Sequence, residues 1–170
     1  MVGSVLPSSR FLSKKMLAPI HFSTAKVIVE LGPGTGVFTK ALLKQLPADT
    51  HLVVIELNDS FFQNLQKQLQ HPNLHLVHGS AADLDQIILD LGFEKADYIL
   101  SSLPLSNFPK ELRSAILHSC QKALIQDGKF IQFQYSRGLK KMYSDFFDRV
   151  DIQYTALNFP PAFIYTCSNS

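Results

Sequence analysis

The sequence has little cysteine, little net charge and no long apolar run, and each shortage excludes a class of protein. Its 170 residues include two cysteines, Cys120 and Cys167, too few for a disulfide framework and typical of a reducing compartment. No apolar stretch approaches the roughly 20 residues of a membrane-spanning helix. The N-terminus lacks the basic and then apolar pattern of a secretory signal. A net charge of +2 does not by itself indicate a nucleic-acid-binding protein. We therefore expect a cytoplasmic globular protein, with peripheral contact with the inner face of the membrane left open.

The composition, 46% apolar and 18% charged, is that of one globular domain in which strand-like and helix-like segments alternate. We expect strands at residues 26–31, 51–57, 74–77, 96–101, 129–135, 149–157 and 162–167. We expect helices at residues 37–46, after a cap at Asn58 or Asp59, at residues 83–91, and after Pro109 with Leu112, Ile116, Cys120 and Leu124 facing inward. This alternation predicts an α/β fold with a parallel sheet. The last two strands are joined without room for a helix and should form an antiparallel hairpin.

The first 25 residues precede this pattern. We expect a leader at residues 1–25 and the domain itself at residues 26–170. If residues 8–18 are helical, Leu12 and Met16 share an apolar face, but its pattern is too irregular to predict a membrane-surface helix. A lid over a ligand and simple packing against the sheet are the two alternatives for this leader.

The most informative stretch is VIVELGPGTG at residues 27–36, a β-branched run that ends in three glycines. Its order predicts a strand, a tight loop at Gly32, Gly34 and Gly36, and then a helix. Glycine adopts backbone angles closed to other residues and leaves no side chain between the main chain and a ligand. Such a loop lies at the carboxyl end of a strand, where open α/β sheets bind nucleotide-type ligands.

Two glutamates flank this loop. Glu30 stands two residues before the first glycine, and Glu56 follows Gly36 by 20 residues, near the end of the second expected strand. An acid at that strand end is placed to bind both ribose hydroxyls of a nucleoside cofactor, although a carboxylate facing water is the simpler alternative. The GxGxG spacing, with these acids, resembles motif I of the class I S-adenosylmethionine-dependent methyltransferases.

This resemblance implies a Rossmann-like, seven-stranded, mostly parallel sheet in the order 3-2-1-4-5-7-6, flanked by helices. It also implies S-adenosylmethionine as the cofactor, with Glu30 either as a buried anchor near the methionine amino group or as an acceptor that orients the loop. Many relatives have an aspartate for the adenine amino group at the position of Ser80. Here Asp83 takes that role, or Ser80 accepts the bond, or Asp83 only caps the next helix. The implied cofactor contacts are Glu30, Leu31, Gly32, Gly34, Thr35, Gly36, Glu56, Leu57, Ser80, Ala81, Asp83 and Ser101.

A narrower resemblance concerns the methyl acceptor. VLPSS at residues 5–9, SSLPL at residues 101–105 and QFQY at residues 132–135 resemble bacterial phospholipid N-methyltransferases in content and order. Those enzymes methylate phosphatidylethanolamine, so the resemblance implies a phospholipid headgroup as substrate, with Ser101, Ser102 and Tyr135 at the catalytic site. The family has glycine at the position of Ser102. For Tyr135, packing under a loop is an equally simple role.

Other functions stay open beside this one. An RNA or rRNA adenine N-methyltransferase shares the glycine loop, but its usual Asn or Asp and its aromatic residue are replaced by Ser101 and Leu105. The low net charge also disfavours nucleic acid as a partner. A module that binds the cofactor without transferring methyl groups is a third alternative. No metal site is expected, because His71, His75 and His78 straddle a turn and a strand. The oligomeric state is not predicted.

Overall fold

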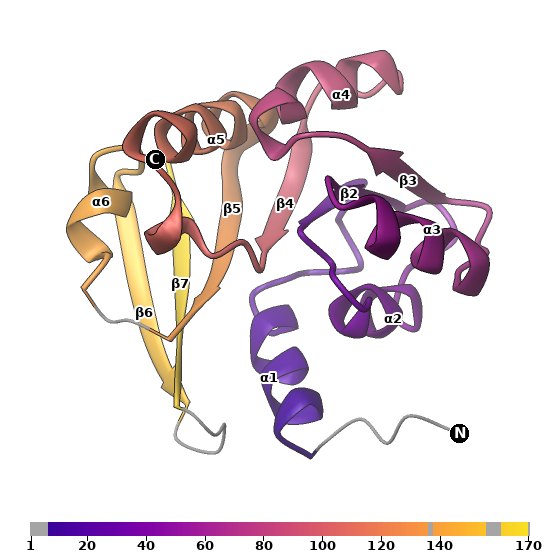
Figure 1. The fold of residues 1–170 in the computed structure, drawn as a ribbon, viewed down its shortest axis with the longest axis horizontal. Coiled ribbons are helices and arrows are strands. Elements are labelled where there is room, and N and C mark those ends of the chain that lie inside the picture. The colour runs from indigo at the N-terminus through magenta and orange to yellow at the C-terminus, as the bar shows by residue number, and fades with distance from the viewer. Residues whose placement is uncertain (1–6, 136–137, 156–160, 170) are drawn as a thin grey trace.

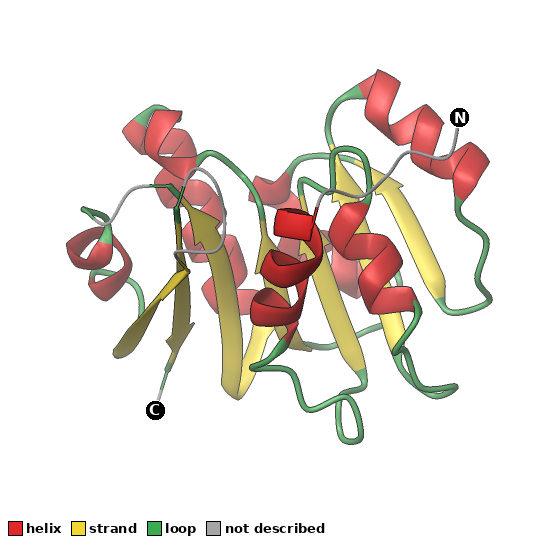
Figure 2. Ribbon diagram, turned by 90° about the horizontal axis from the view of Figure 1, so that it is seen from below, coloured by secondary structure: helices red, strands yellow, loops and turns green. Residues whose placement is uncertain are grey.

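The computed structural model describes residues 7–135, 138–155 and 161–169 of the chain, and in them a single seven-stranded sheet carries helices on both faces (Figures 1 and 2). The strands are β1 Val27–Leu31, β2 His51–Glu56, β3 Leu74–His78, β4 Ala96–Ser101, β5 Leu124–Gln134, β6 Arg149–Thr155 and β7 Ala162–Ser168. The helices are α1 Pro7–Leu17, α2 Val37–Leu43, α3 Asp59–Gln68, α4 Leu84–Asp90, α5 Lys110–Ala123 and α6 Lys140–Ser144, with short 3₁₀ turns η1 at Ala81–Asp83 and η2 at Leu105–Asn107.

The strand order is β3-β2-β1-β4-β5-β7-β6, which confirms the expected topology. Strands β1 to β5 pair in parallel, whereas β7 runs antiparallel to both β5 and β6. The closing hairpin is therefore confirmed, and residues 156–157 of its first expected strand lie outside the described residues. Because β1 to β5 are parallel, their carboxyl ends share one edge of the sheet, where ligands bind in such folds.

Two apolar cores lie on the two faces of the sheet. One core joins α4, α5 and α6 to the sheet through residues such as Ile88, Leu117 and Tyr143. The other joins α1 and α2 to the sheet through Met16, Leu42 and their neighbours. Alternation along β1 decides which side chain enters which core, with Ile28 in the second and Val29 in the first.

The leader helix α1 is part of the second core. Leu12, Met16 and Leu17 are buried there, and α1 packs on α2 and β5. The apolar face expected of this segment is thus real and meets the sheet. The expected division into a leader at residues 1–25 and a domain at residues 26–170 remains a prediction. In the structure, α1 and the sheet share one core.

Several expected element ends were wrong. Helix α2 ends at Leu43 and not at residue 46, because Pro47 disfavours helical angles at the residue before it and the Gln45 amide closes a tight turn onto the Leu42 carbonyl at 2.9 Å. The helix expected at residues 83–91 begins instead with η1 and becomes α-helical at Leu84. Asn58 caps α3, accepting a hydrogen bond from the Phe61 amide at 3.0 Å.

The region of α5 and β5 also differs from expectation. Leu112 is 39% exposed, because α5 begins to bury side chains only at Ile116. Strand β5 starts at Leu124 and not at residue 129 as expected, since Asp127 takes a φ of 63° within an irregularity of the β4–β5 pairing. Helix α6 was not predicted.

Candidate functional site: a glycine loop and an apolar pocket

The glycine loop joins β1 to α2 at the carboxyl edge of the sheet. Gly32, Gly34 and Gly36 all have positive φ, at 67°, 55° and 79°. A Cβ at Gly32 would lie 2.6 Å from the Leu103 side chain, and one at Gly36 would lie 2.7 Å from Leu65. The left-handed backbone angle therefore favours glycine at both positions, as the sequence predicted, and a Cβ there would also have to displace the tip of a leucine side chain.

Glu56 ends β2 beside this loop. Its side chain accepts hydrogen bonds from the Gly34 amide at 3.2 Å and from the Asn58 amide at 2.8 Å. Glu56 is 7% exposed, so the alternative of a carboxylate facing water is wrong. A carboxylate oxygen accepts more than one hydrogen bond, so this acid retains capacity for ribose hydroxyls.

Glu30 is the second acid of the loop and is 1% exposed. Burial raises its pKa to about 7, an effect that Thr39 on α2 partly opposes and the charge of Glu56 reinforces. Among the described residues, neither carboxylate oxygen of Glu30 nor the hydroxyl of Thr39 has a hydrogen-bond partner of normal geometry. Leaving such a group unpaired costs about 1–3 kcal/mol, which favours a site that a ligand completes. The ammonium of S-adenosylmethionine has the charge that this site fits.

The residues expected to surround the adenine differ from one another in exposure and in hydrogen bonding. Leu57 is 68% exposed directly after Glu56. Ser80 accepts a hydrogen bond from the Ala82 amide at 3.2 Å, so Ser80 caps η1. Asp83 is exposed and occupies the N-cap position of α4, but its side chain makes no capping hydrogen bond there. Ala81 packs against the core that joins α4, α5 and α6 to the sheet, called the α5-side core below.

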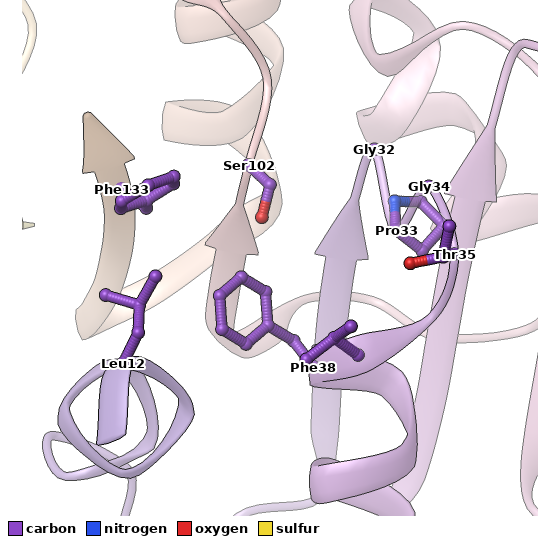
Figure 3. A pocket seen from close by; sticks show the side chains of 9 residues that line it. Leu12, Gly32, Pro33, Gly34, Thr35, Phe38, Ser102 and Phe133 are labelled. Atoms are coloured by element: carbon purple, nitrogen blue, oxygen red, sulfur yellow. The ribbon is translucent and has the colours of Figure 1, made fainter. Parts of the chain in front are cut away.

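An apolar pocket of about 330 Å³ opens on the other side of the glycine loop, towards β4 and β5 (Figure 3). Its walls come from α1, from the loop, from α2, from the end of β4 and from β5: Leu12, Gly32, Pro33, Gly34, Thr35, Val37, Phe38, Ser102 and Phe133. Figure 3 shows Leu12, Phe38, Phe133 and the Ser102 hydroxyl pointing into this common space. No charged side chain is among these described lining residues.

The three expected catalytic residues are not brought together in this pocket. Ser102 lines it, whereas Ser101 is fully buried and its hydroxyl accepts a hydrogen bond from the Leu103 amide at 3.3 Å. Tyr135 is 56% exposed, and its ring meets the edge of Phe133 with centroids 4.8 Å apart. Tyr135 thus lies beside a pocket residue without lining the pocket itself.

Besides Pro33 in the glycine loop, sequence reasoning missed four pocket walls, Leu12, Val37, Phe38 and Phe133. Each belongs to an apolar pattern that equally predicts core packing. The one available signal was position, because Phe133 lies within the QFQY motif and Val37 and Phe38 directly follow the glycine loop.

Two further features concern metal binding and membrane insertion by the described residues. They hold no group of three or more His, Cys, Asp or Glu side chains suited to a metal ion. Two of the histidines do meet, since His51 Nδ1 and His75 Nε2 lie 3.0 Å apart at the amino-terminal edge of the sheet. Among the described helices, none has the length and apolar character needed to cross a bilayer.

Comparison with known proteins agrees with this geometry. The family model of the ribosomal RNA adenine dimethylases matches residues 7–143. An ornithine lipid N-methyltransferase of Singulisphaera acidiphila is 34% identical over 168 residues, which are 98% of this chain and 88% of that protein. Ribosomal RNA small subunit methyltransferase A of Ureaplasma urealyticum serovar 10 is 31% identical over 122 residues, 70% of this chain. The chain spans 42% of that second relative's length.

Among solved structures, the N-methyltransferase NodS of Bradyrhizobium japonicum WM9 has the same fold, with a TM-score of 0.73. The match covers 97% of this chain and 98% of NodS at 13% sequence identity. Solved neighbours of this fold include one in complex with S-adenosyl-L-homocysteine, the demethylated product of the expected cofactor.

Proposed function

The chain belongs to the ribosomal RNA adenine dimethylase family and is a class I S-adenosylmethionine-dependent N-methyltransferase, and from this premise we propose that its methyl acceptor is the amine of a membrane lipid. The observation that carries the proposal is the apolar pocket between the glycine loop and Ser102. A relative of nearly the same length, named for N-methylation of a lipid, supports the same acceptor class.

The apolar walls suit the chemistry of an alkyl amine. An amine attacks only when it is neutral, whereas one with a pKa near that of lysine is mostly protonated at pH 7. A pocket lined by Leu12, Phe38 and Phe133, without a charged lining side chain, disfavours the ammonium form through desolvation. The proton then leaves to solvent as the amine enters.

The residues of this chain bind and orient the reactants. Bound S-adenosylmethionine supplies a methyl group on a strongly electrophilic sulfonium. Glu30 is proposed to hold the cofactor's ammonium and Glu56 its ribose, while the glycine loop lets the cofactor approach the backbone. The Ser102 hydroxyl is proposed to orient the acceptor amine. Alignment of this kind lowers a barrier by up to about 7–11 kcal/mol.

Two amphiphiles present such an amine, phosphatidylethanolamine and an ornithine lipid. The motifs at residues 5–9, 101–105 and 132–135 favour the phospholipid, and the name of the lipid-methylating relative favours the ornithine lipid. Either substrate requires contact between the pocket mouth and a bilayer surface, so we propose peripheral membrane association during turnover.

Methyl-labelled S-adenosylmethionine and three vesicle preparations test the proposal. The vesicles contain phosphatidylcholine alone, phosphatidylcholine with phosphatidylethanolamine, or phosphatidylcholine with ornithine lipid. We expect label in the lipid extract of at least one aminolipid preparation, none in the extract of the vesicles of phosphatidylcholine alone, and no transfer by the Glu56→Gln variant. Absence of label from both aminolipids, with cofactor binding confirmed by calorimetry, would overturn the lipid assignment.

A ribosomal RNA adenine is the second candidate acceptor, and the matched family model favours it. Against it stand Ser101 and Leu105 in place of the polar and aromatic residues expected of adenine methyltransferases. Unmethylated small-subunit RNA in the same assay separates the two functions. Label in RNA, with binding that weakens steeply as salt rises, would support the second candidate.

A further inference from the structure

Gln132 is a buried amide below the acceptor segment, defined as residues 101–105. It lies on β5, is fully buried, and pairs in register with Ser101 on β4 and with Tyr165 on β7. Phe130 and Tyr165 belong to the α5-side core, so alternation along β5 places the Gln132 side chain on that face. A polar side chain buried in an apolar core requires an explanation, because burial without partners is unfavourable.

Its partners lie in the acceptor segment and in its own strand. Gln132 Nε2 lies 2.9 Å from the carbonyl oxygen of Leu103 and 2.7 Å from that of Phe133. Both partners are acceptors, so the NH₂ group must face them and the orientation of the amide is decided. Gln132 Oε1 has no hydrogen-bond partner among the described residues.

The acceptor segment is tied down on both sides of Ser102. The Ser102 amide donates to the Leu31 carbonyl at 3.1 Å, and the Leu103 amide donates to the Ser101 hydroxyl at 3.3 Å. The Leu103 carbonyl accepts from the Leu105 amide at 2.8 Å as well as from Gln132. Among these ties, the bond from Gln132 is the one made by a side chain from another strand.

The same segment contacts the glycine loop. The Leu103 side chain fills the space where a Cβ of Gly32 would stand, at 2.6 Å. A shift of Leu103 would therefore move Ser102 relative to the cofactor loop. Gln132 holds the carbonyl of this same residue without lining the pocket itself.

We propose that Gln132 is a positioning residue for methyl transfer, whose amide holds the acceptor segment so that Ser102 faces the pocket beside the glycine loop. The inference rests on the proposed function, because that function places the acceptor amine at Ser102. Displacing a reacting group by about 1 Å lowers the rate up to about 100-fold. The loss should fall on kcat, since neither the glycine loop nor the two glutamates change.

The test compares Gln132→Met with Gln134→Met. Gln134 is the matched control, because it lies on the same strand and face, is 5% exposed, and donates to the Tyr143 hydroxyl at 3.2 Å and not to the acceptor segment. With the labelled aminolipid assay we expect Gln132→Met to lower kcat about 10- to 100-fold. The cofactor dissociation constant should stay within about threefold of wild type, and Gln134→Met should keep kcat within the same range. Gln132→Asn, which keeps the amide on a shorter arm, is measured alongside and should lose kcat similarly.

Amide hydrogen exchange gives a second readout that needs no acceptor. In Gln132→Met, exchange at the amides of Leu103 and Leu105 should accelerate, whereas Gln134→Met should leave both at the wild-type rate. A kcat for both Gln132 variants within threefold of Gln134→Met, or unchanged exchange at these amides, would overturn the inference. Failure of wild type to label any lipid would overturn the proposed function instead, and the exchange result would still stand by itself.

Discussion

The cofactor side and the acceptor side of this site are built in different ways. On the cofactor side, Glu30 and the three glycines lie within seven consecutive residues, and Glu56 bonds to the loop they form. On the acceptor side, the glycine loop forms one wall of the pocket, and the other walls come from α1, α2, the end of β4 and β5, which are far apart along the chain. One side has buried charge and backbone hydrogen bonds, and the other has apolar walls.

The difference follows from what each side recognises. A nucleoside cofactor has fixed polar groups, so its site needs particular donors, acceptors and backbone angles, which a local motif can supply. An apolar wall needs only shape and exclusion of water, so residues from any element can form it. Changes on the two sides should therefore affect different kinetic constants.

The largest effect is expected from Gly32→Ala. The new methyl group would lie 2.6 Å from the Leu103 side chain, and the alanine backbone would have to keep a φ of 67°. Cofactor affinity measured by calorimetry should fall, because the Leu103 side chain must turn away from the new methyl group and the loop must hold a strained backbone angle.

Gly92→Ala is the matched control for that change. Gly92 has a φ of 88°, but its Cβ would meet nothing within 4 Å. The left-handed angle alone should cost about 1–2 kcal/mol of stability and leave cofactor affinity unchanged. Equal losses of cofactor affinity in both variants would show that backbone strain is responsible, and not the contact between the glycine loop and Leu103.

Glu30→Gln should separate stability from function. The raised pKa means that the folded apoprotein keeps a proton that the unfolded chain releases, so stability falls as pH rises from about 4.5 through about 7. At pH 8 the variant should be more stable than wild type by roughly 3 kcal/mol, since each pKa unit is about 1.4 kcal/mol.

Cofactor binding should move in the opposite direction in the same variant. Wild-type affinity should strengthen as pH rises through about 7, where Glu30 ionises, and the affinity of Glu30→Gln should stay flat. Thermal unfolding without cofactor and calorimetric titrations at pH 6 and pH 8 measure both trends. A pH dependence retained in Glu30→Gln would assign it to another group.

Phe133→Ala probes the acceptor side alone. Removing this ring from the pocket wall should raise the KM for the lipid about 10-fold, in line with the loss of 1–3 kcal/mol for a vacated apolar pocket. Cofactor affinity should change less than about threefold. Phe163→Ala is the control, a half-buried aromatic on the neighbouring strand that does not line the pocket. Similar KM values for the two variants would contradict the assigned wall.

The smallest effect is expected at the opposite edge of the sheet. Burial and the neighbouring His51 lower the pKa of His75, so the folded state binds the proton less readily than the unfolded state. Stability should therefore decline as pH falls below about 6.5, without any change in kcat. His75→Phe, which keeps a ring against Phe93, should remove part of this slope in thermal unfolding. An altered kcat would connect this edge to the site.

Most of the fold could be predicted from the sequence, and the errors in that prediction have local causes. Strand β1, the glycine loop and the closing hairpin were predicted because periodicity and glycine spacing act over a few residues. The end of α2 was misplaced because its apolar pattern runs past Leu43 up to Pro47. Helix α6 was missed because its five residues are too few to show a period.

For the site, the loop by itself predicted a nucleoside cofactor, because the glycines form one continuous segment whose angles depend on local chemistry. Its resemblance to a known motif, together with Glu30 and Glu56, implied S-adenosylmethionine. Only the tertiary structure showed which of the two serines faces the pocket, burying Ser101 and placing Ser102 in the pocket lining. It also decided that Leu12 and Phe133 line one pocket, since apolar residues follow the same pattern in a core and in a pocket wall. What separates those two outcomes is packing between distant segments, which no spacing along the chain records.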